Sequence, residues 1–204
     1  TPLLAPVSAG ICIPAQVSYV ASVLKAPSYI DPASALLMIA ARELSNSYLY
    51  KHIRVQGGAY GGMSSFDSSM GLFSFLSYRD PHIVETLKVF KDAQEFYSKQ
   101  EISSEEMEKA IISSIGALDK PSDPSGRGYT ALIRSFSGIN DDMRQQFRDN
   151  ILSATPQKLK DALLNYFSKA TKSASVAVYS APEKLDEANK QLEEKLLIES
   201  IFES

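Results

Sequence analysis

The sequence is poor in cysteine and histidine and contains no tryptophan. Its 204 residues include one cysteine, Cys12, and two histidines, His52 and His82. A single cysteine forms no internal disulfide, so the fold does not depend on an oxidising compartment. Neither histidine belongs to an H-x-x-E-H or H-E-x-x-H pattern, in which helical spacing directs two imidazoles at one zinc ion. We therefore expect no metal site in this chain and a packed strand position for Cys12.

The chain also lacks basic clusters and long apolar runs. Its formal net charge is −3 at pH 7, whereas a nucleic-acid surface needs clustered Lys and Arg. No apolar run approaches the roughly 18 residues of a membrane span. We expect neither nucleic acid nor a membrane as a partner. The start Thr1-Pro2-Leu3-Leu4 has no initiator methionine or signal-peptide pattern, so we interpret the chain as a domain cut from a longer protein, with a processed product as the alternative.

Several catalytic motifs are missing as well. There is no G-x-S-x-G elbow, Walker loop or dinucleotide-binding fingerprint. The glycines of Gly57–Gly62 end a predicted helix and enter a strand, so they offer no helix N-terminus to a phosphate. The adjacent acids Glu105-Glu106 and Asp141-Asp142 lie near predicted helix starts, where the helix dipole explains them.

What the sequence does contain is a regular order of strands and helices. Alternation of apolar residues predicts one long strand over Ile11–Leu24, bent near Pro14. Asp31-Pro32 predicts the start of a helix that runs to about Arg54. Two strands near Ala59–Ser65 and Leu72–Tyr78 should then form a hairpin.

The second half is predicted to be mainly helical. Helices should start at Asp80-Pro81, at the capping box of Ser103, after a Lys120–Gly128 loop, at Asp141 and at Thr155-Pro156. A strand is expected at Ser175–Ser180. An amphipathic helix should follow from Glu183 and bury Leu185, Ala188, Leu192 and Leu196. This order predicts a single α+β domain over residues 1–204. Its sheet should be mixed and mostly antiparallel, with the helices packed on one face.

The most informative segment joins the predicted helix to the hairpin. Arg54-Val55-Gln56-Gly57-Gly58-Ala59-Tyr60-Gly61 places an arginine, a tyrosine and three glycines within eight residues. Glycines allow a sharp turn and a close approach of another chain. Arginine supplies a planar set of donors, and tyrosine a rigid hydroxyl. Such a segment suits the binding of a peptide backbone, and a simple helix stop with a core tyrosine is the alternative.

The segment from Leu49 to Gly61 resembles the C-terminal substrate-gripping motif of the pitrilysin/insulinase (M16) zinc peptidases. Within that family, the nearest branch is the presequence protease group. Weaker pieces agree with this resemblance, and they are Ile13–Val20, the hairpin followed by Tyr78-Arg79-Asp80-Pro81, Ile112–Asp119, and Gly126-Arg127-Gly128-Tyr129.

The resemblance implies a fold like the repeated LuxS/MPP-like domain of that family. This chain would be the fourth, zinc-free domain of a four-domain protein that closes around unfolded peptides. Zinc would be bound by another domain, so the full-length enzyme would need it while this fragment would bind none and would be inactive alone. The partners would be peptide substrates and the N-terminal domains of the same chain.

The resemblance also assigns roles to individual residues. Tyr60 would direct its hydroxyl at the scissile carbonyl and help to bind the oxyanion, and Arg54 would hold a neighbouring carbonyl. Gly57, Gly58 and Ala59 would complete the substrate-binding segment, with the two glycines in a structural role.

Two other functions remain open from the sequence. One is a catalytically silent relative that serves as a peptide-binding or assembly subunit, and the other is a stand-alone interaction domain. The compartment would be the mitochondrial matrix or a plastid in a eukaryote, and the cytoplasm or periplasm in a bacterium.

Overall fold

The protein is built around one six-stranded sheet with the strand order β3-β4-β2-β5-β1-β6. The computed structural model describes residues 6–99, 101–170 and 174–200. The strands are β1 (Ser8–Cys12), β2 (Ser18–Lys25), β3 (Gly61–Asp67), β4 (Leu72–Asp80), β5 (Ser175–Ser180) and β6 (Leu197–Ser200). Strand β1 runs parallel to both of its neighbours, β5 and β6, while the pairs β2–β4, β2–β5 and β3–β4 are antiparallel. The expected mixed, mostly antiparallel sheet is therefore confirmed.

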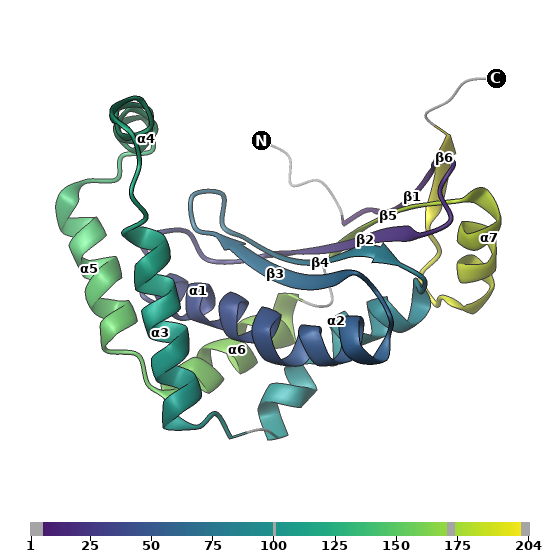
Figure 1. Ribbon diagram of the computed structural model, residues 1–204, viewed down its shortest axis with the longest axis horizontal. Helices are drawn as coiled ribbons and strands as arrows, with labels where there is room; N and C mark the ends of the chain where they lie inside the picture. Colours follow the sequence, from purple (N-terminus) through teal and green to yellow (C-terminus); the bar gives the residue numbers. More distant parts are fainter. Residues whose placement is uncertain (1–5, 100, 171–173, 201–204) are drawn as a thin grey trace.

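Helices cover one face of this sheet and leave the other open (Figure 1). They are α1 (Ala33–Leu44), η1 (Ser45–Gln56), α2 (Val84–Lys99), α3 (Ser104–Leu118), α4 (Pro124–Phe136), α5 (Asp141–Leu152), α6 (Pro156–Ala170) and α7 (Pro182–Gln191). Among the described residues, none of these helices combines the length and apolarity that a bilayer crossing would need.

The core lies between the sheet and this helical layer. Phe75 stacks against Phe90 of α2, with ring centroids 5.4 Å apart, and Phe73 meets Phe167 of α6 edge-on at 5.1 Å. Helix η1 adds Leu49 and Ile53, both buried. The burial of these large apolar side chains is the main force that holds the helices on the sheet.

The predicted long strand over Ile11–Leu24 is wrong, because the chain turns at Pro14 and forms two strands, β1 and β2. Strand β5 lies between them and pairs with both. Proline fixes φ and offers no amide donor, so it cannot continue a central strand. The prediction joined two segments whose alternation continues across the break.

In β2, the buried face is not the more apolar face that the sequence pattern indicates. Ser18, Val20, Ser22 and Leu24 face the helices and are buried. The residues between them, which include Tyr19, Ala21 and Val23, lie on the open face. The more apolar side of this strand is therefore the side without helices.

Two predictions in the second half need correction. The predicted C-terminal amphipathic helix ends at Gln191, and the chain then enters β6, so Leu196 is buried from the segment before that strand. The predicted loop over Lys120–Gly128 is shorter, because Asp123 caps α4 and Pro124 begins it. An aspartate cap followed by proline is a strong helix start, and it outweighs the two glycines.

The helix predicted to start at Asp80-Pro81 begins at Val84, because Asp80 still belongs to β4, and most other predicted boundaries agree with the structure. The capping box at Ser103 is present, with Glu106 as its partner. Strand β5 has the predicted bounds, and the hairpin strands β3 and β4 lie within two residues of their predicted positions.

The helix that leads to the glycine-rich turn changes its winding halfway. Helix α1 has ordinary α spacing, and from Ser45 the chain continues as a π-helix, η1, to Gln56. At the change, the Ser45 and Ser47 hydroxyls donate to the carbonyl oxygens of Ala41 and Glu43, four residues back. Such bonds compete with the regular helical ladder, and π-helical turns are often found at functional sites.

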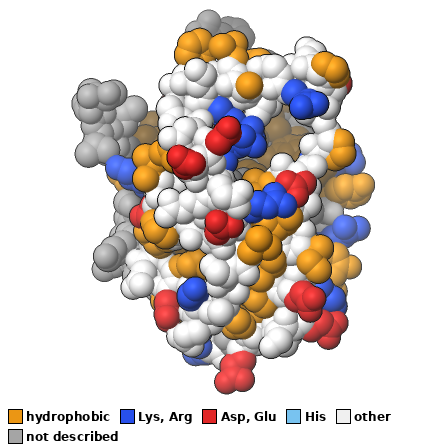
Figure 2. Space-filling model, turned by 90° about the vertical axis from the view of Figure 1, so that its left-hand side faces the viewer, with side chains coloured by type: hydrophobic (Ala, Val, Ile, Leu, Met, Phe, Trp, Pro, Cys, Tyr) orange, Lys and Arg blue, Asp and Glu red, His pale blue; other side chains and the backbone are white. Residues whose placement is uncertain are grey.

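Helix α4 is much less buried than the helices that cover the sheet. None of its residues is buried, and Tyr129, Leu132, Ile133 and Phe136 are exposed large hydrophobic side chains. Figure 2 faces this end of the molecule and shows hydrophobic side chains gathered at the top, where α4 lies.

Candidate functional site

The site begins at the C-terminal end of η1, where three consecutive amides bond back to the helix. Gly57 N–H donates to the His52 carbonyl at 3.0 Å, Gly58 N–H to Arg54 at 3.1 Å, and Ala59 N–H to Ile53 at 3.1 Å. Gly58 has a φ of 73°, a left-handed conformation that favours glycine. The turn ends the helix and sends the chain directly into β3.

Two further glycines permit close packing at this turn. A Cβ on Gly57 would lie 2.7 Å from the Ile53 carbonyl oxygen, and a Cβ on Gly62 would lie 2.6 Å from the Ile53 Cβ. Both distances are below any tolerable contact, so these positions need glycine. The Gly62 contact shows that β3 lies directly against η1.

The turn places Arg54 and Tyr60 on the same surface. The Arg54 guanidinium carbon lies 5.9 Å from the centre of the Tyr60 ring and 5.7 Å from the centre of the Tyr50 ring. Both Arg54 and Tyr60 are exposed, and Tyr60 retains 66% of its accessible surface. Cation–π attraction at such distances contributes about 0.5–1 kcal/mol at an exposed site.

Arg54 carries an uncompensated positive charge. None of the described carboxylates lies within salt-bridge distance of its guanidinium. Its donors therefore remain available to carbonyl or carboxylate oxygens of a ligand.

Two contacts with strand β4 fix the position of Tyr60. Its amide donates to the carbonyl oxygen of Arg79 at 3.3 Å, and its ring meets the edge of the Tyr78 ring at 5.9 Å. Arg79 has a φ of 50°, and the pairing of β2 with β4 shifts register here, which marks a β-bulge. Bulges of this kind redirect side chains and are common beside functional sites.

The predicted substrate-binding residues do not all have the same access to a ligand. Arg54 and Tyr60 are exposed, and Gly58 is exposed as well. Ala59 is only 4% exposed and its amide is already bonded to Ile53, so its methyl group packs into the core. Ala59 thus positions Tyr60 beside it.

Tyr50, Tyr78, Arg79 and Gly62 also belong to this site, although the sequence did not single them out for it. Tyr50 lies within the motif segment, one turn before Arg54, so its position in the sequence could have indicated that it belongs to the site. Tyr78 and Arg79 come from a different strand, and only the bulge brings them under Tyr60.

The described residues do not supply a zinc-binding set. No group of three or more His, Cys, Asp or Glu side chains that could hold a metal ion occurs in the described part of the chain. The His82 Nδ1 atom lies 3.8 Å from a Glu85 carboxylate oxygen, and His52 packs beside the Tyr48 ring. Zinc sites need three or four protein ligands, so these histidines do not fit that ion.

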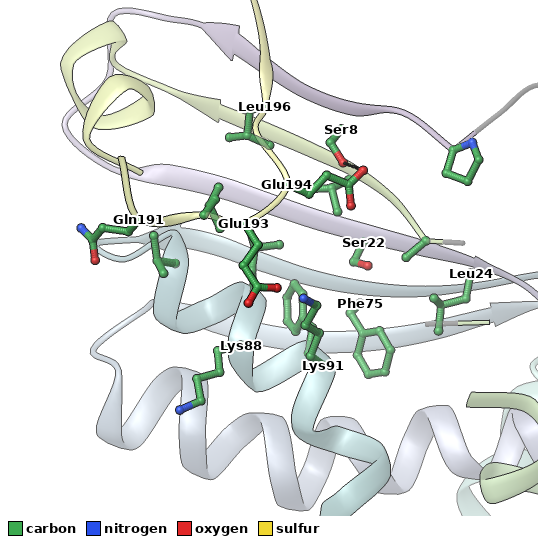
Figure 3. Close-up of a pocket in the computed structure, with 17 residues that line it drawn as sticks. Ser8, Ser22, Leu24, Phe75, Lys88, Lys91, Gln191, Glu193, Glu194 and Leu196 are labelled. Atoms are coloured by element: carbon green, nitrogen blue, oxygen red, sulfur yellow. Dashed lines mark hydrogen bonds between the residues drawn. The ribbon is translucent and has the colours of Figure 1, made fainter. Parts of the chain in front are cut away.

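A separate cavity of about 490 Å³ lies on the helical face of the sheet. Figure 3 shows it between the sheet, α2 and the segment after α7, with Phe75, Leu24 and Ser22 on its walls. Lys88, Lys91, Glu193 and Glu194 also line it. Neither Arg54 nor Tyr60 is among its lining residues, so it is not part of the Arg54–Tyr60 surface.

The sequence and the fold both match known peptidases. A family model described as "PreP C-terminal domain" matches residues 9–181. Presequence protease 1 of Arabidopsis thaliana, chloroplastic/mitochondrial, is 38% identical over 183 residues, which are 89% of this chain and 17% of that protein. The mitochondrial presequence protease of Xenopus laevis is 33% identical over 159 residues, which are 77% of this chain and 15% of that protein.

A solved structure shows the same fold at lower identity. The peptidase M16 inactive domain from Pseudomonas fluorescens superimposes with a TM-score of 0.65 at 17% identity, covering 85% of this chain and 44% of that one. This chain therefore has the fold of an M16 peptidase domain, and it spans only about a sixth of the length of the two presequence proteases. The match over residues 9–181 shows that the chain belongs to the family of presequence protease C-terminal domains.

Proposed function

We propose that this chain is the fourth domain of a four-domain zinc endopeptidase, and that Arg54 and Tyr60 grip the backbone of an unfolded peptide during cleavage. The observation that carries the proposal is the shared, exposed position of the two side chains, 5.9 Å apart from guanidinium carbon to ring centre. A helix stop with a core tyrosine would instead bury the ring, and Tyr60 is 66% exposed.

Each residue has a distinct task. The Tyr60 hydroxyl donates to the carbonyl oxygen of the scissile bond as negative charge develops there, which is the role of an oxyanion-hole donor. The Arg54 guanidinium donates to a neighbouring carbonyl and holds the peptide extended. Gly57 and Gly58 make the turn that brings both groups to one surface. Zinc, bound by another domain of the full-length protein, supplies the activation of water.

The names of the relatives support a substrate class and a compartment. The proteins from Arabidopsis thaliana and Xenopus laevis are named presequence proteases, chloroplastic/mitochondrial and mitochondrial. The full-length protein would accordingly degrade cleaved targeting peptides and other unfolded peptides in the mitochondrial matrix or a plastid, with its N-terminal domains closing the chamber.

The test is Tyr60→Phe in the full-length protein. This change removes only the hydroxyl, and loss of one oxyanion donor lowers kcat by about 10²–10³-fold. KM should change little, because the contact is made mainly in the transition state. The matched control is Tyr129→Phe on the exposed surface of α4, which should leave both constants unchanged. Unchanged turnover in Tyr60→Phe would remove Tyr60 from the mechanism.

The same experiment separates the enzyme from a catalytically silent relative. Full-length protein that binds unfolded peptides but cleaves none, with or without added zinc, would indicate a peptide-binding or assembly subunit. An H-x-x-E-H motif in the preceding domains is the corresponding sequence signal for the enzyme.

A further inference from the structure

The open face of the sheet carries a row of tyrosines that continues from Tyr60. Tyr78 on β4 is the register partner of Gly61, the residue after Tyr60, and Tyr19 on β2 is the register partner of Tyr179 on β5. The Tyr60 and Tyr78 ring centres are 5.9 Å apart, and the Tyr78 and Tyr19 ring centres are 5.4 Å apart, both with edge-on geometry. We call Tyr60, Tyr78, Tyr19 and Tyr179 the tyrosine row.

The tyrosine row is accessible. Tyr60 is 66% exposed, Tyr78 44% and Tyr179 43%, while Tyr19 is half-buried between its neighbours. Tyr78, Tyr19 and Tyr179 alternate with the buried positions of their strands, so they lie on the face that the helices leave open in Figure 1.

The surface around the row is mainly apolar, with charged side chains at its two ends, Arg54 beside Tyr60 and Glu199, the register partner of Ile11 on β6. Beside it on the same face lie Ile11, the register partner of Tyr179, and the cross-strand pair Met63 and Leu76. Ala21, Val23, Ala177 and Ser74 continue this face along the strands. Soluble proteins rarely leave a contiguous apolar face of this kind uncovered unless it binds something.

The charge at one end of the row limits the ligand. Arg54 lies against the Tyr60 ring and has no carboxylate partner among the described residues. Its guanidinium already occupies the cation site of that ring, and a second cation there would be repelled. Apolar or aromatic side chains are therefore favoured over Lys and Arg at the Tyr60 end of the row.

The length of the row fits an extended peptide. The row crosses the neighbouring strands β3, β4, β2 and β5, and strands lie about 4.8 Å apart, so it spans about 14 Å. An extended chain rises about 3.4 Å per residue and points alternate side chains the same way. About four peptide residues cover the row, and two side chains separated by one residue face it.

We propose that the tyrosine row is a side-chain-binding subsite that selects peptide segments with bulky apolar or aromatic residues at positions i and i+2, beside the bond gripped by Arg54 and Tyr60. The proposal rests on the proposed function for the position of the backbone. It adds the class of side chain that the domain selects.

The test uses the full-length protein and a set of unfolded peptides. Each peptide carries a Phe, Leu, Ala or Lys pair at i and i+2, moved along an otherwise constant sequence. Wild-type protein should show kcat/KM about tenfold higher for the best-placed Phe or Leu pair than for the Ala pair, because the larger side chains bury more apolar area against the rings. Lys pairs should be the poorest substrates.

Three variants test the row itself. Tyr78→Ala and Tyr179→Ala should each reduce the Phe-over-Ala preference to about threefold or less, as less apolar area remains to bind the pair. Tyr78→Phe keeps the ring and should retain the preference. Tyr129→Ala, which replaces an exposed tyrosine on α4, is the control and should change nothing. A preference that survives both alanine variants, or a preference for Lys pairs, would overturn the proposal.

Equilibrium binding distinguishes this proposal from the proposed function. The affinities of the same peptides are measured by fluorescence anisotropy in the presence of a metal chelator, where cleavage does not interfere. If the row selects side chains but the protein is a silent relative, the binding preference depends on Tyr78 and Tyr179 although no peptide is cut. If Tyr60→Phe abolishes turnover while the alanine variants leave both preferences intact, the gripping role stands and the row does not.

Discussion

At the scale of single residues, Glu43 is the most unusual group in the helical layer. It is 6% exposed, and its Oε2 atom has no hydrogen-bond partner among the described residues. Burial raises the pKa of this carboxyl from 4.5 to about 7, opposed by the hydrogen bond from Ser47 and assisted by the nearby charge of Glu106. The folded state therefore binds a proton here that the unfolded chain has released.

This difference predicts a pH dependence of stability. Between pH 4.5 and about 7 the folded state holds the proton and the unfolded state does not, so the Glu43 contribution to stability falls as pH rises through that range. Glu43→Gln should remove this fall and stabilise the protein by up to about 3 kcal/mol at pH 8. Urea unfolding at pH 5 and pH 8 measures the effect.

The exposed Glu101 provides the matched control. Glu101→Gln should leave the unfolding free energy within about 0.5 kcal/mol of wild type at both pH values. If Glu43→Gln lowers stability at pH 8, the charged form of Glu43 has a partner that the described residues do not reveal.

The shared surface of Arg54 and Tyr60 could be predicted from the sequence because the signal is local, while their roles stay a prediction. Arg54, Gly57, Gly58 and Tyr60 all lie within one short segment, and one turn decides where they point. Tyr78 could not be assigned to the same surface, because its orientation depends on a bulge between β2 and β4. Alternation along Leu72–Asp80 places bulky residues on both faces, so the pattern does not identify the open one.

At the scale of elements, the contact between η1 and β3 decides the geometry of the site. The absence of a side chain on Gly62 allows the strand to lie against Ile53. Two serine hydroxyls reinforce this contact, because Ser64 N–H donates to the Ser45 Oγ at 2.8 Å and the Ser64 Oγ donates to the Ala41 carbonyl at 2.7 Å. The π-helix and the strand thus form one unit that carries Arg54 and Tyr60.

Gly62→Ala tests this contact. The added Cβ would lie 2.6 Å from the Ile53 Cβ, and overpacking of this kind costs about 1–3 kcal/mol. Gly61→Ala is the matched control, since its Cβ would meet only the flexible Met63 Cε at 3.6 Å. It should leave stability unchanged or slightly raised. The measurement is the midpoint of urea unfolding for both variants.

A second variant identifies the clashing partner. In an Ile53→Ala background the cost of Gly62→Ala should become smaller without vanishing, because the two γ carbons at 2.8 and 3.1 Å are removed while the Cβ at 2.6 Å remains. Equal costs in both backgrounds would show that the γ carbons of Ile53 do not contribute to the strain.

The sequence could not reveal the π spacing of η1 or the position of β6. Over a few turns, the same apolar stripe is compatible with α and with π spacing. The Ser45 hydroxyl, at the start of η1, bonds both within the helix, to Ala41, and to Ser64 on β3, and the sequence does not reveal this second contact. Strand β6 has only four residues, all exposed, and it exists because β1 offers a parallel edge. The capping box at Ser103 and the Asp31-Pro32 start were reliable because their hydrogen bonds form within one turn, whereas α2 begins only at Val84, after Asp80-Pro81.

At the scale of the whole molecule, the two faces of the sheet have different roles. One face buries the core against the helices, and the other carries Tyr78, Tyr19 and Tyr179, while Arg54 approaches Tyr60 from the end of η1. The exposed side chains of α4 form a second apolar surface at the far end of the molecule (Figure 2). The chain thus has two exposed apolar surfaces, on the open face of the sheet and on α4. Its described residues contain no group of side chains that could bind a metal ion.

This organisation predicts that the isolated chain binds unfolded peptides without hydrolysing them. A catalytic zinc ion needs three protein ligands and an open position, and in residues 6–99, 101–170 and 174–200 no three candidate ligands lie together. Purified chain is incubated with a long unfolded peptide and added zinc, cleavage is followed by mass spectrometry, and full-length protein serves as the positive control. Binding without cleavage is expected, because the role that we propose for Arg54 and Tyr60 is to hold a backbone, and neither side chain can activate water. If a peptidase activity co-purifies with the isolated chain and is lost on addition of a chelator, the catalytic centre lies inside this domain. That result would contradict the proposal that this domain only binds the peptide while another domain cleaves it.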